Sequence, residues 1–346
     1  MNRPCRDCDP ESPSLPRREF LRVATAGAAA AAFSTATPLF AEPAAAKAKT
    51  EPESLVKVLF ESLTENQKKD VCFDWEFTEP QRKLLRTRVS NNWHITKPVI
   101  NSDYFTKDQQ HLVRNIFEGI IQPEWHAKID KQLKDDAGGF GNQQNIAIFG
   151  KPGDGKFEFV MTGRHMTLRC DGNSSDHVAF GGPIFYGHAA SGFNEKPGHP
   201  NNVYWEQALA ANKVFEMLDG KQREKALLKD SPVEESVGFR GEKGGYPGLA
   251  VSDMSSDQKE LVQKTLNKLI EPYRQSDQDE VVACLKKQGG LDKCALSFYS
   301  DDDLGEDKVW DNWRLEGPSF VWYFRGVPHV HVWVHIADDP SVKLNV

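Results

Sequence analysis

The sequence is poor in positive charge and has no long hydrophobic run. Among its 346 residues, 43 Lys and Arg stand against 50 Asp and Glu, giving a formal net charge of -7. Nucleic acids and anionic membranes require basic patches, so this balance argues against both as partners. The apolar stretch over residues 23–33 is too short and too weakly hydrophobic for a retained membrane span. The absence of a Gly-x-Ser-x-Gly motif also disfavours serine-nucleophile chemistry.

The N-terminus carries the pattern of an export signal. Arg17-Arg18 is followed by Phe20-Leu21, an Ala-rich apolar stretch, and cleavage candidates near Ala41 and Ala46. This order resembles a twin-arginine (Tat) signal, so we expect residues 1–45 to be a signal and linker. No Cys directly follows the apolar stretch, which disfavours a lipoprotein anchor. The expected partner is the Tat machinery and the expected location is the periplasm or the extracellular space.

Cysteine is scarce, and its spacing excludes a zinc-ribbon framework. Two of the six cysteines precede the twin arginine and are expected to leave with the signal. The remaining four are scattered and form no Cys-x-x-Cys pair. Cys284 and Cys294 flank a Gly-containing turn, so two alternatives stay open. They form a disulfide in an oxidising compartment, or they stay as two buried thiols.

Helical and strand patterns alternate in long blocks along the rest of the chain. We therefore expect one α+β domain over residues 46–346, with an antiparallel sheet as its core. The expected blocks are helical over 50–136, β-rich over 144–190, helical over 202–285, and a β-hairpin over 310–337.

Local signals predict individual helices within these blocks. The apolar stripe over Glu53–Phe73 predicts one continuous helix, and Asn202–Leu228 is predicted to be helical as well. Ser/Thr-x-x-Gln sequences are typical of capping boxes at helix starts. They occur at Thr64, Thr106 and Ser255.

A strand near the C-terminus is rich in histidine. It contains His329, His331, Trp333 and His335 at alternate positions, so these four side chains are expected to share one face. Three imidazoles on one strand face provide the ligand type preferred by zinc, copper and iron. The alternative is that the rings pack at a sheet surface without binding anything.

A second strand provides a further candidate ligand, His165. If the two β-rich regions join one antiparallel sheet, His165 approaches His329 and His331, and the imidazoles bind a divalent transition metal. Glu316 is a candidate fourth ligand, general base or anchor for an imidazole N–H, or else a surface carboxylate. In the Gly-rich segment after His165, Tyr186 is a candidate for proton transfer and His188 for substrate binding.

Five segments of the chain resemble the motifs of the DUF3500 family, in the same order and with similar spacing over most of residues 46–346. They are Gly163–Arg169, Gly182–Gly187, Leu218–Arg223, Leu315–Pro318 and His329–His331.

The chain departs from the family pattern at three of these candidate positions. Arg164 stands where the family usually has the first of two adjacent histidines, and Glu316 stands where an amide or a similar polar residue is usual. His335 takes the place of a basic residue. The resemblance implies a shared architecture and supplies no reaction, because the function of the family is unknown.

Three hypotheses follow. The first is an exported metal-dependent hydrolase or oxidoreductase that acts on a small molecule. Its metal ligands are His165, His329, His331 and His335, and its catalytic candidates are Glu316, Tyr186 and Arg164. The second is a non-catalytic exported protein that binds a metal or a small ligand. The third is a metal-free protein whose histidines only pack.

Overall fold

The computed structural model describes residues 51–172, 174–189 and 202–345. The predicted signal, residues 1–45, lies outside the described residues. The described helices are α1 (Pro52–Ser62), α2 (Glu65–Val71), α3 (Lys107–Ile120), α4 (Pro123–Ala137), α5 (Trp205–Glu216), α6 (Gly220–Ala226), α7 (Ser256–Ile270) and α8 (Gln275–Lys287). The described strands are β1 (Cys72–Phe73), β2 (Thr78–Glu79), β3 (Lys83–Leu84), β4 (Asn145–Gly150), β5 (Phe157–Gly163), β6 (Met166–Cys170), β7 (Ile184–His188), β8 (Leu227–Leu228), β9 (Leu249–Ala250), β10 (Ala295–Tyr299), β11 (Asn312–Gly317), β12 (Phe320–Arg325) and β13 (Val330–Ile336).

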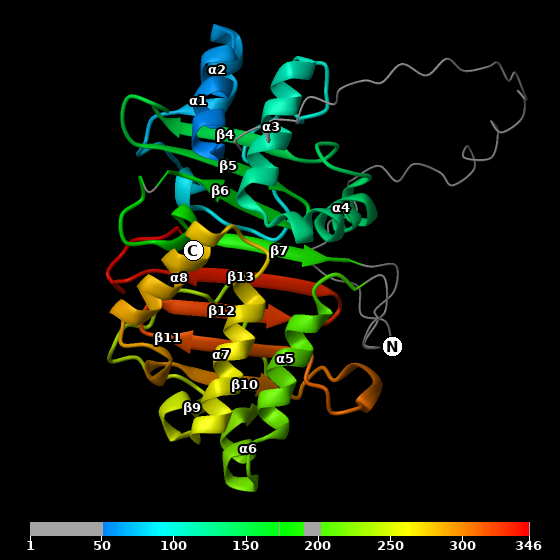
Figure 1. The fold of residues 1–346 in the computed structure, drawn as a ribbon, viewed down its shortest axis with the longest axis vertical. Helices are drawn as coiled ribbons and strands as arrows, with labels where there is room; N and C mark the ends of the chain where they lie inside the picture. Colours follow the sequence, from blue (N-terminus) through cyan, green and yellow to red (C-terminus); the bar gives the residue numbers. More distant parts are fainter. Residues whose placement is uncertain (1–50, 173, 190–201, 346) are drawn as a thin grey trace, which may run out of the picture. The chain divides into compact units, whose positions relative to one another are not determined.

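The expected α+β fold with a mostly antiparallel sheet is confirmed. Eleven of the described strands form one sheet in the order β1-β4-β5-β6-β7-β13-β12-β11-β10-β8, and β9 also pairs with β10. Strands β4 to β7 form one meander and β10 to β13 form another (Figure 1). The antiparallel pairing of β7 with β13 joins the two meanders, as the metal hypothesis requires.

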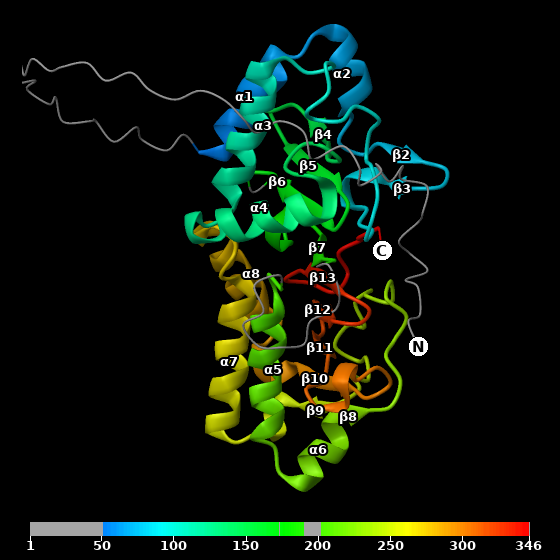
Figure 2. The ribbon, with the colours of Figure 1, turned by 90° about the vertical axis from the view of Figure 1, so that its right-hand side faces the viewer.

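The two faces of the sheet are covered differently. Helices α1, α3, α4, α5, α7 and α8 lie on one face, whereas β2, β3 and long connections lie on the other (Figure 2). The helix-covered face buries the main hydrophobic core, which includes Trp125, Trp313 and Trp322. Smaller apolar clusters on the opposite face contain Phe185, Tyr323 and Trp333, packed against the connections. Connections can carry polar and charged side chains toward the sheet, so residues from them can contribute to a functional site on this face.

Helix caps agree with the sequence signals, and one predicted helix is divided by such a cap. Thr64, Thr106 and Ser255 each accept a hydrogen bond from the backbone N–H of the Gln three residues later, which confirms the capping boxes. The continuous helix predicted over Glu53–Phe73 is wrong, because the Thr64 cap starts α2 as a separate helix. The segment Asn202–Leu228 likewise contains two helices, α5 and α6.

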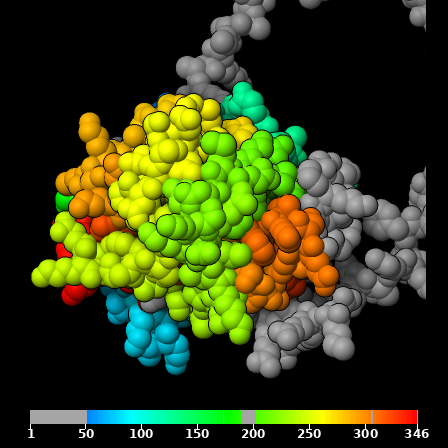
Figure 3. Space-filling view, turned by 90° about the horizontal axis from the view of Figure 1, so that it is seen from below, coloured from blue at the N-terminus to red at the C-terminus, as the bar shows by residue number. Residues whose placement is uncertain are grey.

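The C-terminal β region is larger than the predicted hairpin. Strand β10 precedes it, and β11, β12 and β13 form a meander instead of a single pair. Figure 3 views the molecule from below and shows α5, α6 and α7, with the β10–β11 connection, drawn in orange, beside them. None of the described helices has the length and apolar character needed to cross a membrane.

The four cysteines of the described residues, Cys72, Cys170, Cys284 and Cys294, are free thiols. Of the two alternatives for Cys284 and Cys294, the structure therefore shows buried thiols and no disulfide. Burial raises the pKa of each of these two thiols to about 12.

Candidate metal centre

His165, His329 and His331 converge on one point at the junction of the two meanders. His165 lies in the turn between β5 and β6, whereas His329 precedes β13 and His331 lies within it. Nε2 of His165 is 3.1 Å from Nε2 of His329 and 3.1 Å from Nε2 of His331. One nitrogen from each ring falls within a group whose members are all within 4.8 Å of one another. These three histidines could therefore hold a metal ion.

The strand register explains how His165 reaches His331 across β7. Tyr186 of β7 is paired with Met166 of β6 on one side and with Val332 of β13 on the other. Continued by one residue, this register places Gly187 between His165 and His331. Glycine has no side chain, so the two imidazoles meet over the intervening strand. The backbone of His165 has a φ of 54°, and its N–H donates to the carbonyl of Asn91, which fixes the turn that presents the ring.

The separation of the nitrogens fits a transition metal. Two imidazole nitrogens, each about 2.0–2.1 Å from one ion, lie about 2.8–3.4 Å apart at angles between octahedral and tetrahedral values. The observed 3.1 Å separations fall in this range. The exposed fractions of His165, His329 and His331 are 1%, 7% and 0%, so the centre is almost dry. Three ligands leave at least one position open for water or a substrate.

A buried carboxylate orients the ring of His165. Oδ2 of Asp136, the penultimate residue of α4, is 2.8 Å from Nδ1 of His165. Asp136 also accepts hydrogen bonds from Nε2 of Gln132 and from the N–H of Ala189. Burial alone would raise the pKa of Asp136, but the hydrogen bond with His165 and the other partners hold it below its usual value. An ionised Asp136 keeps the proton of His165 on Nδ1 and leaves the Nε2 lone pair facing the centre.

Glu234, from the connection between β8 and β9, occupies the corresponding position beside His331. Its carboxylate is hydrogen-bonded to Nδ1 of His331, accepts from the indole N–H of Trp333, and pairs with Arg325 at 3.1 Å. Nη2 of Arg325 also lies 2.7 Å from Nδ1 of His331, so guanidinium and carboxylate compete for this nitrogen. A metal on Nε2 favours the tautomer that donates from Nδ1 to Glu234.

The two strand histidines are held in the neutral form that binds metals. Burial lowers the pKa of His329 to about 3, with contributions from His165 and Arg325. Burial also lowers the pKa of His331 well below its usual value, and Arg325 and His165 add to the effect. Neutral imidazoles expose the lone pairs that coordination requires, and no proton has to be displaced.

His188 lies near this centre but is occupied by protein groups. Its Nε2 is 3.1 Å from Oδ2 of Asp135, and its Nδ1 accepts from the N–H of Val203. Burial lowers its pKa. The ring therefore has no free nitrogen for a substrate, although its position next to Asp136 helps to fix the end of α4 against β7.

His335, a predicted ligand, is not part of the convergent group. It shares the strand face of His331 but lies four residues further along β13, about 13 Å at 3.3–3.4 Å per residue. Both of its ring nitrogens are buried without a hydrogen-bond partner. The pairing of Val321 with both His335 and Glu316 places Glu316 in the same distant row.

Glu316 and Tyr186 make contacts away from the three histidines. The Glu316 carboxylate is paired with Arg240 at 2.8 Å and with Arg314 at 2.9 Å. The Tyr186 hydroxyl donates to Gln207 on the helix-covered side, and burial raises its pKa well above its usual value. The structure thus brings together three of the four predicted metal ligands and adds Asp136 and Glu234, which the sequence did not reveal.

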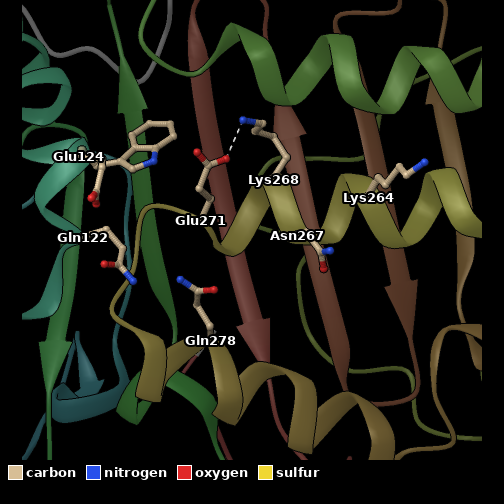
Figure 4. A pocket seen from close by; sticks show the side chains of 8 residues that line it. Gln122, Glu124, Lys264, Asn267, Lys268, Glu271 and Gln278 are labelled. Atoms are coloured by element: carbon tan, nitrogen blue, oxygen red, sulfur yellow. Dashed lines mark ion pairs between the residues drawn. The ribbon is translucent and has the colours of Figure 1, made fainter.

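Figure 4 shows a different feature, a surface groove of about 560 Å³ between α4, α7 and α8. Lys268 and Glu271 form an ion pair on its wall at 2.6 Å, and Gln122, Asn267 and Gln278 line the rest with Lys264 and Glu124. Its lining contains none of the three histidines. The remaining lining residue is Trp125, and none of the lining residues is a histidine or a cysteine, so the groove offers no comparable metal-binding chemistry.

Fold and site together define an α+β protein with a buried three-histidine centre at a strand junction. A family model described as "Protein of unknown function (DUF3500)" matches residues 45–336, and the chain belongs to this family. No curated protein and no solved structure gives a significant match to the chain.

Proposed function

We propose that this protein is an exported metal-dependent enzyme whose metal is held by His165, His329 and His331. The observation that carries the proposal is the convergence of three Nε2 atoms in a buried site, where burial lowers the pKa of His329 and of His331. Packing alone does not require imidazole lone pairs to face one another at 3.1 Å, because such pairs repel unless a proton or a metal lies between them.

Zinc is the metal that this ligand set suits best. Three neutral histidines leave the full charge of the ion uncompensated in its first coordination sphere, which favours acidification of a bound water for hydrolysis. Copper or iron remain alternatives because imidazole also suits them, and either metal would favour oxidation. A hydrolase is the better supported reaction class, because the common iron oxygenase site includes a carboxylate ligand.

The residues of the chain have separate tasks in this proposal. Asp136 and Glu234 fix the tautomers and orientations of His165 and His331, and the surrounding aromatic side chains exclude water. The open coordination position accepts water or a small-molecule substrate. Glu316 and Tyr186 are bonded to other protein groups away from this position, and the two carboxylates beside the ligands, Asp136 and Glu234, are bonded to the ligand rings.

Metal analysis tests the proposal. The purified protein should contain about one equivalent of a transition metal. The double variant His329→Ala, His331→Ala should contain almost none. His126→Ala is the matched control, since His126 bonds only to backbone carbonyls of Glu118 and Ile121 and should leave the metal content unchanged. A double variant with full metal content would refute the site.

A metal-binding protein without turnover is the second candidate. It is favoured by the absence, among the described residues, of an acid–base side chain free of protein partners at the centre. The visible absorption of the cobalt-substituted protein separates the two candidates. A spectrum that responds to added cyanide indicates an open position and an enzyme, whereas an unresponsive, saturated spectrum indicates a carrier.

Export is tested separately. Arg17→Lys, Arg18→Lys should keep the protein in the cytoplasm, while the unchanged chain is recovered from the periplasm or the medium. Equal distribution of both versions would contradict a Tat signal.

A further inference from the structure

Arg164 differs from the other arginine at the centre in having no anionic partner. The guanidinium of Arg325 is paired with Glu234 at 3.1 Å. Arg164, by contrast, makes no side-chain hydrogen bond or ion pair within the part of the chain that the structure describes. Its Nε is buried without a partner, as is the Nε of Arg325. A half-buried guanidinium with an unpaired Nε is costly, because that buried donor loses water without gaining an acceptor.

The position of Arg164 places this charge beside the metal ligands. It directly precedes His165, and a backbone bridge to Asn92 fixes it next to the turn that presents the His165 ring. Its charge acts on both strand ligands, where it contributes to the lowered pKa of His329 and of His331. Arg164 therefore lies next to His165 in the chain and acts on the two strand ligands through its charge, although it is not a ligand.

The charges around the occupied centre do not balance. A divalent metal with Arg325 and Arg164 supplies four positive charges, and Asp136 and Glu234 supply two negative ones. Asp135 adds little, since it pairs with Lys131 at 2.5 Å. The three histidines are neutral ligands in this state. An occupied centre thus has an excess of two positive charges in an almost dry environment, which an anion would neutralise.

We propose that Arg164 binds the oxyanion of a small-molecule ligand while another atom of that ligand, or the oxyanion itself, occupies the open metal position. The planar fork of guanidinium donors matches a carboxylate or a phosphate. This inference rests on the proposed metal centre and deepens it, because it names the substrate as an anionic small molecule.

The test is an anion titration of the cobalt-substituted full-length protein, followed by visible absorption. Metal content is measured first, so that a failure of the metal centre is seen independently of anion binding. Acetate and inorganic phosphate are titrated separately, and the tighter of the two identifies the oxyanion. The variants are Arg164→Gln, Arg164→Lys and the control Arg223→Gln, in which an exposed arginine that bonds to backbone carbonyls of Phe215 and Glu216 is removed.

We expect saturable anion binding by the unchanged protein and by Arg223→Gln. Arg164→Gln should retain cobalt but bind the anion on the order of 10- to 100-fold more weakly. Arg164→Lys should be intermediate, because it keeps the charge and loses the fork. Equal affinity in Arg164→Gln, or a cobalt spectrum that neither anion changes, would overturn the assignment. A protein that binds no cobalt would refute the metal centre and with it this inference.

Discussion

Gly187 of β7 is paired with His331 of β13, and no side chain stands between the ring of His331 and the ring of His165. A Cβ atom at position 187 would lie 2.2 Å from the carbonyl oxygen of Val330 and 3.4 Å from Cδ2 of His331. The close approach of β7 and β13 thus depends on glycine at this position, and so does the meeting of the two histidine-bearing segments.

Gly187→Ala should therefore weaken both the fold and the metal centre. The added methyl group pushes β13 away from β7, and we expect a loss of about 2–4 kcal/mol in the free energy of unfolding together with reduced metal content. Urea unfolding and metal analysis measure the two effects. Gly220→Ala is the control, because a Cβ there has no neighbour within 4 Å. Equal stability of both variants would contradict the role of Gly187.

Asp136→Asn should lower metal affinity without removing a ligand. The amide cannot stabilise the Nδ1–H tautomer of His165 as a carboxylate does, so we expect affinity to fall about 10- to 100-fold. Glu234→Gln should act similarly through His331. Competition with a chromophoric chelator provides the measurement. The neighbouring Asp135→Asn should bind metal normally, as Asp135 contacts His188 and not the three ligands. Unchanged affinity in Asp136→Asn would refute the orienting role.

His335 should make the protein sensitive to acid. Burial lowers its pKa to about 3, with smaller effects from Arg314 and Arg169. In the unfolded chain its pKa is about 6.5, so below that pH the unfolded state takes up a proton that the folded state refuses. Above pH 6.5 this proton uptake does not affect the free energy of unfolding. As the pH falls from 6.5 toward 3, the free energy of unfolding decreases by up to about 1.4 kcal/mol per pH unit.

His335→Phe isolates this effect. At pH 7 the variant should be as stable as the unchanged protein or more stable, since two unpartnered buried nitrogens are removed. Between pH 6.5 and 5 the free energy of unfolding in urea should fall by up to about 2 kcal/mol less in the variant than in the unchanged protein. Its metal content should be unchanged. A loss of metal would instead make His335 a ligand.

The thiols of Cys284 and Cys294 should be unreactive in the native protein. Burial raises both pKa values to about 12, so the thiolate is scarce at pH 8. A thiol reagent should react with them only after denaturation, and the number of reactive groups should not depend on prior reduction. Two additional thiols that appear after reduction would indicate a disulfide.

The histidine face of β13 was predictable because alternation in a strand is a local property. The same holds for the capping boxes, in which the pairing residues are three positions apart. Alternation specifies which face of the strand a residue occupies. It does not specify at which position along the strand a residue from another segment, such as His165, lies. His335 therefore has the expected face and lies about 13 Å from His331, outside the convergent group.

Asp136 and Glu234 could not be predicted, because each reaches the centre only through tertiary packing. Asp136 is one of two adjacent carboxylates at the end of α4, and the sequence does not distinguish it from Asp135. Glu234 lies in a connection with no periodicity. Strand β10 was missed because Ala295–Tyr299 is short and every residue in it is buried, so it lacks the alternation that marks a half-exposed strand.

Strand β13 is the last of the described strands in the sequence, yet it lies in the middle of the sheet. During synthesis the backbone N–H and C=O groups on the facing edges of β7 and β12 stay unpaired until β13 has left the ribosome. Two of the three histidines, His329 and His331, are part of this last segment. If the three histidines bind a metal as proposed, the complete ligand set therefore exists only in a chain that has been translated beyond His331. A nascent or shortened chain that ends before His329 has only His165 of the three ligands, and a single histidine binds a metal ion weakly.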